Sequence, residues 1–427
     1  SISDASIKWN NNKGCNSTRR GNFKIKLLEG ENSLTFQHIS YKTKTITLFL
    51  SENETKNIEI ILEDDINMLS DIEIIKDKND KIITDVLTIK RIKSESFQKE
   101  VNNDLSDILQ RFSGVTLSDN QISIRGGSGW NAMAGSRVLV LIDDIPLLSG
   151  DMGQIPWDLI PIENIEEIKV LKGAASAIYG SAAMNGVINV KTKSANKTQI
   201  NNNKFPGYTQ INSSFGMYDS PKNKNHKWWN GKRYFYKIDA LHSEILGNTS
   251  LTLGFNHFTD EGYRYLEENN RNQFSLNLFH NPKNIDRLIF GVNGTFMKQE
   301  VGHFLLWESY ENAYIPIDSN LYSSNSTLFH LDPFVSFKTN NGKHSVKSRF
   351  MKIQLDNKTN GVETGKDMFS ETYYIDYKYK GWLDFLSSDL IIGATNSNVF
   401  AKAEVFNGEN SSSTNSVYLL IEKEKDA

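Results

Sequence analysis

The fold is decided by residues Ile122–Ser194, which read ISIRGGSGWNAMAGSRVLVLIDDIPLLSGDMGQIPWDLIPIENIEEIKVLKGAASAIYGSAAMNGVINVKTKS. Glycine-punctuated loops separate four short runs of β-forming residues, at 122–125, 137–142, 165–171 and 187–192. Glycine lets such loops take positive φ angles or pass close to another backbone. Asp143, Asp144 and Pro146 follow the second run and predict a turn. We therefore expect a small domain with its own hydrophobic core.

The order of these pieces is characteristic. IRG is followed by RVLVLID, then by IP, and then by IENIEEIKVLKGAASAIYGSAAMNGVINV. This series closely resembles the plug domain of TonB-dependent outer-membrane receptors, a domain that sits inside a large β-barrel. One position departs from the family pattern, because Asp144 stands where the family usually has glycine. We assign the plug to residues 81–195, including a capped core helix near residues 103–112.

Composition limits the classes of protein that fit. The chain has 427 residues, a formal net charge of -3, a pI of about 6.3 and a mean hydropathy of -0.46. A slightly negative net charge does not indicate the basic surface that a nucleic-acid-binding protein uses. The longest nearly apolar run, Val138–Leu148, is far shorter than the ~20 residues of a spanning helix, which excludes a helical membrane bundle. A single cysteine, Cys15, allows no intrachain disulfide and no cysteine cluster for zinc.

The first 63 residues alternate apolar and polar positions with period two, in runs at 23–27, 34–38, 46–50 and 58–62. This pattern, with turn signals between the runs, predicts a small antiparallel β-sandwich over residues 1–63. The sequence GNFKIKLLEGENSLTFQHISYKTKTITL resembles the carboxypeptidase regulatory-like domain often found ahead of the plug, with its opening strand truncated. No histidine has Glu three residues on, as a zinc-peptidase helix requires, so we expect a scaffold without metal or catalysis.

Residues 64–80 read as a linker. Within it, LSDIEII resembles the TonB box, the segment that an energy-coupling protein captures as an added β-strand. Alternating apolar and polar residues suit strand addition, because main-chain bonds give affinity and alternate side chains give register. An ordinary linker strand, or a last strand of the sandwich, is the alternative. The candidate box comprises Leu69, Ser70, Asp71, Ile72, Glu73, Ile74 and Ile75.

From residue 196 onward the chain is a series of alternating strands of roughly ten residues, the length that a tilted strand needs to cross a membrane. Tyr234, Tyr236 and Ile238, for instance, share one face, opposite Lys237 and Asp239. Links between strands alternate in length, which is typical of extracellular loops and periplasmic turns. The long links are 219–232, 260–271, 301–326 and 357–368, and the short ones are 245–248, 282–285 and 339–342.

We therefore expect residues 196–427 to hold the first ~10 strands of a transmembrane β-barrel, since plugged transporters close with ~22. By the same argument the chain is expected to be the N-terminal and central part of a longer protein without its export signal. Residues 346–355 fit the alternation worst, because their apolar parity slips near Met351, and we attribute this to a β-bulge. The expected fold is mainly β: an N-terminal sandwich, an α+β plug and an incomplete antiparallel barrel.

Ligand contact is expected where plug loops and long barrel loops converge. Aromatic side chains suit stacking on a ligand, although an aromatic girdle or ordinary loop packing would use the same residues. By resemblance, Arg125 and Arg137 match positions where the family's plug holds the barrel wall through buried ion pairs, so they are candidates for a releasable lock. Surface binding of a phosphate-type group is the alternative for them. The ligand candidates are Trp130, Asn131, Met133, Trp228, Trp229, His303, Trp307 and Tyr310.

The resemblance implies an active transporter without an enzymatic site or cofactor. It would lie among the lipids of the outer membrane of a Gram-negative bacterium, with the N-terminal domain and plug on the periplasmic side. Its ligand would be an iron chelate, haem, cobalamin, a peptide or a glycan, and a TonB-type energy-coupling protein would draw on the plug. A surface lipoprotein is a further candidate partner for glycan or peptide import. The alternatives are a signalling receptor, which usually has an extra N-terminal domain, and a passive porin or adhesin, which should lack the plug.

Overall fold

A computed structural model of the chain separates into two compact units, Ser1–Lys76 and Asp77–Ala427. Among the residues described below, no helix is long and apolar enough to cross a membrane. The structure describes residues 5–9, 13–18, 21–38, 41–52, 54–62, 88–97, 104–118, 121–126, 137–151, 153–173, 179–195, 207–285, 287–303, 306–317, 322–339, 341–383, 388–404 and 407–422.

The first unit contains a four-stranded antiparallel sheet in the order β2-β1-β3-β4. Ile7, Leu34 and Phe36 form its core. Two predicted strands, 23–27 and 58–62, lie outside this sheet, although their apolar side chains still pack against the core. Period-two alternation reports which side of an extended segment is buried, and such a segment packs without joining a ladder. The strands are β1 (Ser6–Trp9), β2 (Lys13–Asn16), β3 (Gly30–His38) and β4 (Tyr41–Leu50).

The second unit begins with a five-stranded sheet in the order β5-β10-β11-β8-β9, in which β8 runs parallel to β11. Strands β6 and β7 form a separate ribbon. The four β-forming runs predicted around Ile122–Ser194 correspond to β7, β8, β10 and β11, so that prediction is confirmed. The strands are β5 (Thr88–Lys93), β6 (Val115–Ser118), β7 (Gln121–Ile124), β8 (Val138–Ile142), β9 (Ile145–Pro146), β10 (Ile165–Lys172) and β11 (Gly186–Thr192).

A short helix, α2 (Leu105–Gln110), packs into the core of this domain, as its apolar face predicted. Asp104 caps it, since its Oδ1 accepts a hydrogen bond from the Ser106 backbone at 2.7 Å. The predicted turn between β8 and β9 is present, with Asp143 and Asp144 at φ 51° and 71°. Single 3₁₀ turns complete the domain: η3 (Ser94–Ser96), η4 (Trp157–Leu159), η5 (Ile162–Asn164) and η6 (Ser181–Ala183).

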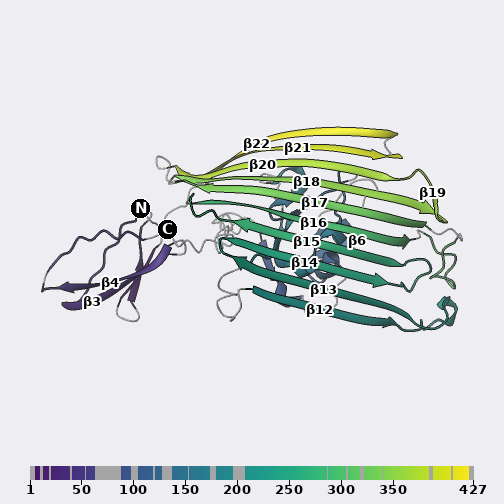
Figure 1. The fold of residues 1–427 in the computed structure, drawn as a ribbon, viewed down its shortest axis with the longest axis horizontal. Helices are drawn as coiled ribbons and strands as arrows, with labels where there is room; N and C mark the ends of the chain where they lie inside the picture. The colour runs from purple at the N-terminus through teal and green to yellow at the C-terminus, as the bar shows by residue number, and fades with distance from the viewer. Residues whose placement is uncertain are drawn as a thin grey trace. The chain divides into compact units, whose positions relative to one another are not determined.

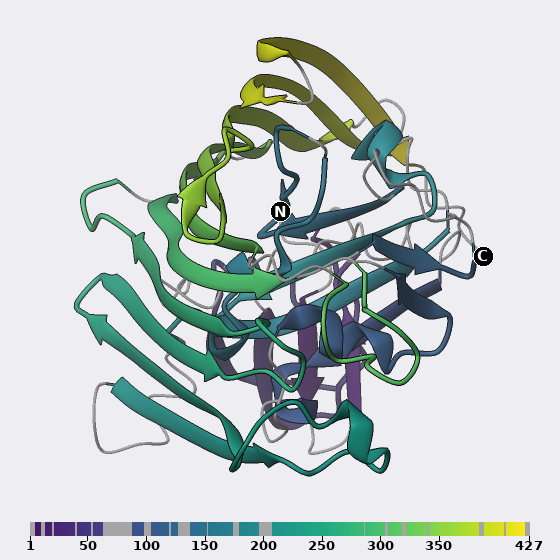
Figure 2. The same cartoon turned by 90° about the vertical axis from the view of Figure 1, so that its right-hand side faces the viewer.

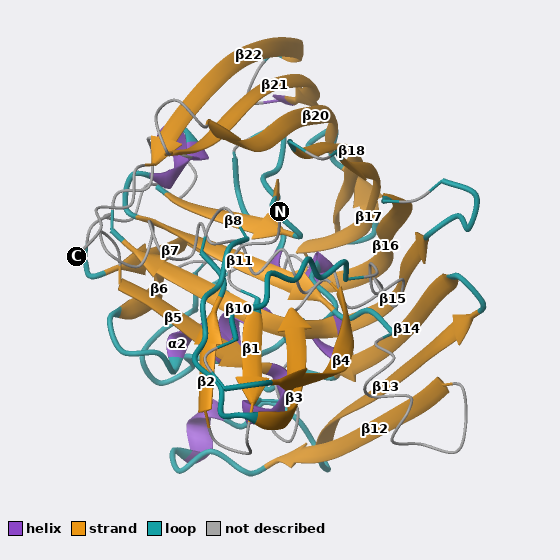
Figure 3. Ribbon diagram, turned by 90° about the vertical axis from the view of Figure 1, so that its left-hand side faces the viewer, coloured by secondary structure: helices purple, strands orange, loops and turns teal. Residues whose placement is uncertain are grey.

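The remaining strands form one large antiparallel sheet, ordered as in the sequence from β12 to β22, with the two-residue β19 paired to β18 at its side (Figure 1). Seen end-on, the sheet curves as an open arc around the plug strands (Figures 2 and 3). Its strands are β12 (Gly207–Tyr218), β13 (Arg233–Leu246), β14 (Thr249–Asp260), β15 (Asn269–His280), β16 (Leu288–His303), β17 (Tyr322–Lys338), β18 (Gly342–Thr359), β19 (Val362–Glu363), β20 (Met368–Leu383), β21 (Ser388–Ala403) and β22 (Gly408–Glu422).

Links between neighbouring strands alternate as predicted from β12 to β20, although 261–268 and 281–287 are nearly equal, and the last link, 404–407, is short where the alternation would make it long. Fourteen residues, 219–232, join β12 to β13 and include η7 (Lys224–His226), whereas only 247–248 join β13 to β14. Because all the neighbours are antiparallel, the long links gather at one end of the sheet and the short ones at the other.

The predicted bulge in β18 is wrong. Its pairing with β20 is continuous from Gly342 to Leu355, without a shift of register. Met351 and Ile353 break the parity because they face inward and join the hydrophobic core of the plug. The alternation rule assumes a polar inner face, and it fails where a domain inside the arc presents apolar side chains to the strand.

Candidate functional site at the interface of plug and sheet

Strand β15 shows how the large sheet is built. Its buried positions are polar, and they include Gln273, Ser275 and Asn277, which are between 1% and 5% exposed. Its outward positions are apolar, with Phe274 53% exposed. This is the reverse of a soluble sheet and is the pattern of a barrel wall that faces lipid outside and polar groups inside.

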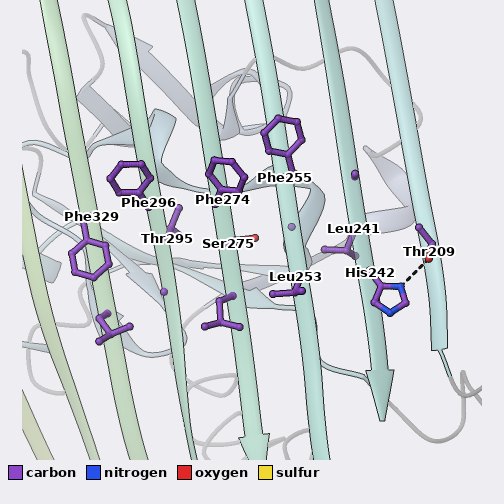
Figure 4. A pocket seen from close by; sticks show the side chains of 15 residues that line it. Thr209, Leu241, His242, Leu253, Phe255, Phe274, Ser275, Thr295, Phe296 and Phe329 are labelled. Atoms are coloured by element: carbon purple, nitrogen blue, oxygen red, sulfur yellow. Dashed lines mark hydrogen bonds between the residues drawn. The ribbon is translucent and has the colours of Figure 1, made fainter. Parts of the chain in front are cut away.

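The outer face carries a row of four phenylalanines on neighbouring strands. Phe255, Phe274, Phe296 and Phe329 stand directly opposite one another from β14 to β17 (Figure 4). Beside them Gly294 lacks a side chain, and the resulting hollow of about 490 Å³ is lined mainly by apolar groups. Such a surface offers a solute mainly apolar contacts, so we place the functional site on the other face.

On the inner face, η4 and η5 of the plug are held by β15. Arg271 is paired with the Asp158 carboxylate. Gln273 donates to the backbone carbonyls of Asp158 at 3.1 Å and Leu159 at 2.8 Å. Asn164 donates to Asn277 Oδ1 at 3.1 Å. These bonds pair buried polar groups from both sides, and each such group would destabilise the interface by about 1–3 kcal/mol if it were left unpaired.

The turn between β8 and β9 makes a second set of contacts, with β16 and β18. Lys347 Nζ donates to Asp143 O and to Asp144 Oδ2, each at 2.8 Å. Asn293 donates to Asp143 Oδ2 at 3.1 Å. Within the plug, Lys191 Nζ lies 2.6 Å from the same Asp144 Oδ2. Two lysines, one from each side of the interface, therefore share one carboxylate.

Arg349 on β18 completes the hold on this turn. It is fully buried and forks onto Asp332 of β17, with Nε at 2.8 Å from Oδ1. Its Nη1 donates to Pro146 O at 2.7 Å and lies 3.4 Å from Ile145 O. A planar guanidinium suits this task, because it binds a carboxylate with one edge and still has donors for the plug backbone.

Burial and neighbouring charges shift the pKa values of two carboxyl groups of the plug, Glu163 and Asp144. Burial and the neighbouring Asp239 carboxylate raise the pKa of Glu163 to about 7, against the weaker influence of Lys237 and Arg271. Its Oε1 has no hydrogen-bond partner. Burial would also raise the pKa of Asp144, but the surrounding lysines hold it well below its ordinary value. One carboxyl is therefore poised near neutrality and the other stays ionised.

The long links pack on one another through aromatic side chains. Trp228 Nε1 donates to Tyr263 O at 2.9 Å, and its ring stands edge-on to Tyr265 at 4.7 Å. His226 Nε2 lies 3.0 Å from Tyr310 O, which ties the link before β13 to the link before β17. Three separate links thus form one aromatic structure at this end of the sheet.

The candidate ligand residues fall into different positions. Trp228 takes part in loop packing and Trp229 is only 6% exposed, whereas Trp307 and Tyr310 are 56% and 82% exposed. Because Trp307 and Tyr310 are exposed, they are available to contact a ligand. Trp130, Asn131, Met133 and the candidate TonB box Leu69–Ile75 lie outside the described residues, as does the side chain of His303.

Arg125 and Arg137, the candidates for the lock, are both exposed. Asp144 and Asp158 of the plug form ion pairs across the interface, with Lys347 and Arg271 of the sheet. The sequence analysis did not single out Lys347 and Arg349 on the sheet, although a signal existed, because both occupy alternate positions of one strand and share its inward face. Among the described residues, no group of three or more His, Cys, Asp or Glu is placed to hold a metal ion.

Comparison with known families agrees with this architecture. Residues 83–187 match the TonB-dependent Receptor Plug Domain, and residues 1–74 match the CarboxypepD_reg-like domain. The chain therefore contains a plug domain preceded by a carboxypeptidase regulatory-like domain, the two domains that its sequence predicted.

Individual relatives point the same way. The probable TonB-dependent siderophore receptor PirA of Acinetobacter baumannii is 32% identical over 34% of this chain and 21% of its own length. The vitamin B12 transporter BtuB of Vibrio cholerae is 31% identical over 29% of this chain and 20% of its own. TonB-dependent receptor SusC of Bacteroides thetaiotaomicron is 28% identical over 47% of this chain and 20% of its own. Each match covers a minor part of the relative.

Solved structures share the fold at low sequence identity. The siderophore receptor PirA from Pseudomonas aeruginosa has a TM-score of 0.54 at 17% identity, covering 78% of this chain and 54% of that one. The ferric yersiniabactin uptake receptor FyuA from Yersinia pestis has a TM-score of 0.57 at 12% identity, covering 77% and 50%. The chain spans about half the length of these structures.

Proposed function

We propose that the complete protein is a TonB-dependent receptor of the outer membrane, which takes up a scarce extracellular ligand by energy-coupled transport. The observation that carries this proposal is a plug domain packed by polar contacts against the inner face of a sheet whose outer face is apolar. A plug that packs against the inner face of the curved sheet supports gated import rather than passive flow, because the plug must move before a solute passes.

The ligand is expected to bind at the end of the sheet where the long links gather. Trp307 and Tyr310 are the exposed aromatic residues of that region that we assign to it. Siderophores and vitamin B12 are the ligands in the names of the relatives, so they are the first to test. The proposal includes no catalytic step.

Energy is proposed to reach the plug from a periplasmic TonB-type protein through Leu69–Ile75. An extended segment with alternating side chains supports capture by strand addition. A force on this segment would act on the domain that follows it, and the plug contacts to β15 and β18 are the ones that must give way.

The test uses cells that express the complete receptor and lack their own uptake systems. Labelled ferric enterobactin and vitamin B12 are supplied, and the accumulated probe is measured in wild type, Ile72→Pro and the matched control Ile72→Leu. Proline removes a backbone donor and blocks strand pairing, so Ile72→Pro is expected to bind but not accumulate the probe. Accumulation that survives both Ile72→Pro and dissipation of the proton gradient would refute energy-coupled transport.

A further inference from the structure

The hollow on the outer face of the large sheet is a trough that crosses neighbouring strands. The strand pairing aligns one residue of each strand from β13 to β17 along it: His242, Leu253, Leu276, Gly294 and Leu331. The row of phenylalanines lies two positions away on β14 to β17 and borders the trough on one side (Figure 4). Leucine reaches less far from the sheet than phenylalanine and Gly294 has no side chain, so the space of about 490 Å³ is left open.

The length of the trough matches that of one acyl chain. Neighbouring strands in a sheet lie about 4.8 Å apart, so the step from β13 to β17 gives the trough a length of about 19 Å. The hydrocarbon core of a membrane is about 30 Å thick, so a chain from one leaflet spans about 15 Å of it. An extended acyl chain therefore fits along the trough. It would also restore the close contacts that the open space over Gly294 lacks.

The trough runs from one edge of the apolar face toward its middle. His242 lies four residues before the end of β13 at Leu246, whereas Leu331 lies seven residues before the end of β17 at Lys338. Both strands end in short links, 247–248 and 339–341, and short links are typical of the periplasmic side of a barrel. A lipid of the periplasmic leaflet has the same direction, with its headgroup at the membrane edge and its chain pointing toward the middle.

Polar groups mark the edge of the trough. Ser275 and Thr295 also line it, but they are only 5% and 4% exposed and belong to the inner face. On the outer face, His242 Nδ1 lies 2.8 Å from Thr209 Oγ1, which orients the ring (Figure 4). The other ring nitrogen, His242 Nε2, lies 3.6 Å from Glu244 Oε2. An imidazole and a carboxylate therefore stand together where a headgroup would lie.

These two groups suit a headgroup that carries both charges. A histidine ring donates a hydrogen bond to a phosphate oxygen, and a carboxylate attracts an ammonium group. The Glu244 side chain is 29% exposed, and Gly207, which stands opposite it on β12, adds no side chain to cover it. An anionic headgroup would bring only negative charge to this carboxylate. A phospholipid with an amine headgroup therefore fits better than an anionic phospholipid.

We propose that the trough binds one phospholipid with an amine headgroup from the periplasmic leaflet. Its acyl chain lies over Leu276 and Gly294, and its headgroup contacts His242 and Glu244. Lipid chains elsewhere in the membrane already have apolar surroundings, so the affinity comes from packing in the trough and from the headgroup contacts. The inference rests on the outer-membrane location in the proposed function, but it is independent of transport.

Native mass spectrometry of the complete receptor, released from detergent micelles, tests the headgroup contacts. Palmitoyl-oleoyl phosphatidylethanolamine and phosphatidylglycerol are added separately at equal concentrations, and occupancy by the first lipid is measured. Wild type is expected to bind phosphatidylethanolamine about fivefold more tightly, the order of one exposed ion pair. Glu244→Gln is expected to abolish this preference. Glu300→Gln, near the other end of the sheet on β16, is the matched control and is expected to keep it.

A second pair of variants tests the trough itself. Leu276→Trp fills it with a larger side chain and is expected to weaken binding of both lipids about tenfold, because the acyl chain loses its packing contacts. Ile375→Trp, on the outer face of β20 and 45% exposed before substitution, is the matched control and is expected to bind lipid as wild type does. Gel migration without heating checks that each variant is folded.

Three outcomes overturn the proposal. Equal binding of the two lipids by wild type would show that the headgroup is not recognised. Undiminished binding by Leu276→Trp would show that the chain lies elsewhere. Receptor pairs that Leu276→Trp dissociates would assign the trough to a second copy of the chain. Ligand uptake is measured separately: its failure with lipid selectivity intact refutes only the proposed function, and lost selectivity with uptake intact refutes only the lipid site.

Discussion

Replacing Arg349 by methionine is the sharpest perturbation of the interface. The side chain is fully buried, pairs with the buried Asp332 and donates to Pro146 O. Methionine fills a similar volume but cannot donate. It would leave the Asp332 carboxylate next to His330, 3.2 Å away, as its remaining basic neighbour among the described contacts.

The magnitude follows from these contacts. Removing one partner of a buried ion pair costs about 3–5 kcal/mol, and the orphaned Pro146 carbonyl adds about 1–3 kcal/mol. With a urea dependence of about 3 kcal/mol/M, the unfolding midpoint should fall by about 1 M or more. The double variant Asp332→Leu/Arg349→Met removes the stranded charge and is expected to recover most of this loss, since apolar replacement of a buried pair is often neutral.

The assay is urea unfolding of the receptor in detergent micelles, followed by tryptophan fluorescence, to which the seven tryptophans of this chain contribute. Hydrogen exchange of the peptide Val138–Leu147 reports in parallel on the turn that Arg349 holds. A single variant with the wild-type midpoint would refute the reasoning. So would a double variant no more stable than the single one, because the predicted cost arises from an unpaired carboxylate.

Two further predictions concern the same interface. The pKa of Glu163 rises from 4.5 to about 7 on folding. The protonated side chain therefore contributes its full stabilisation of the folded protein below pH 4.5, and this stabilisation is lost as the pH rises through about 7. We therefore expect the free energy of unfolding of Glu163→Gln, relative to wild type, to increase by on the order of 3 kcal/mol from pH 5 to pH 8. The urea midpoints of the two proteins at each pH measure this change. The same difference between the midpoints at pH 5 and at pH 8 would contradict the prediction. A Cβ on Gly150 would lie 2.6 Å from Val399 Cγ1 and 3.1 Å from Ser370 Cβ, so Gly150→Ala should cost about 1–3 kcal/mol by crowding. Gly153→Ala, in open space, is the control, with only about 1 kcal/mol of backbone strain expected. A larger loss at Gly153 than at Gly150 would show that crowding is not the cause.

Local patterns in the sequence were sufficient for the elements and for the family. The β-forming runs of the plug, the turn at Asp143 and Asp144 and the alternating long and short links all depend on neighbours in the chain, and the structure has them where they were predicted. The N-terminal unit shows the limit of such patterns, because period two identified the buried faces of 23–27 and 58–62 but not which segments join the ladder.

Only the tertiary structure decided which residues hold plug and wall together. Lys347 and Asp144 are 203 positions apart, and their meeting depends on the register of every strand from β12 to β18 and on the curvature of the arc. The inward-facing apolar side chains of Met351 and Ile353 are likewise explained only by the plug residues on which they pack, and these lie elsewhere in the sequence. A sequence determines the elements it forms locally, whereas contacts between distant segments arise from how all the intervening elements pack.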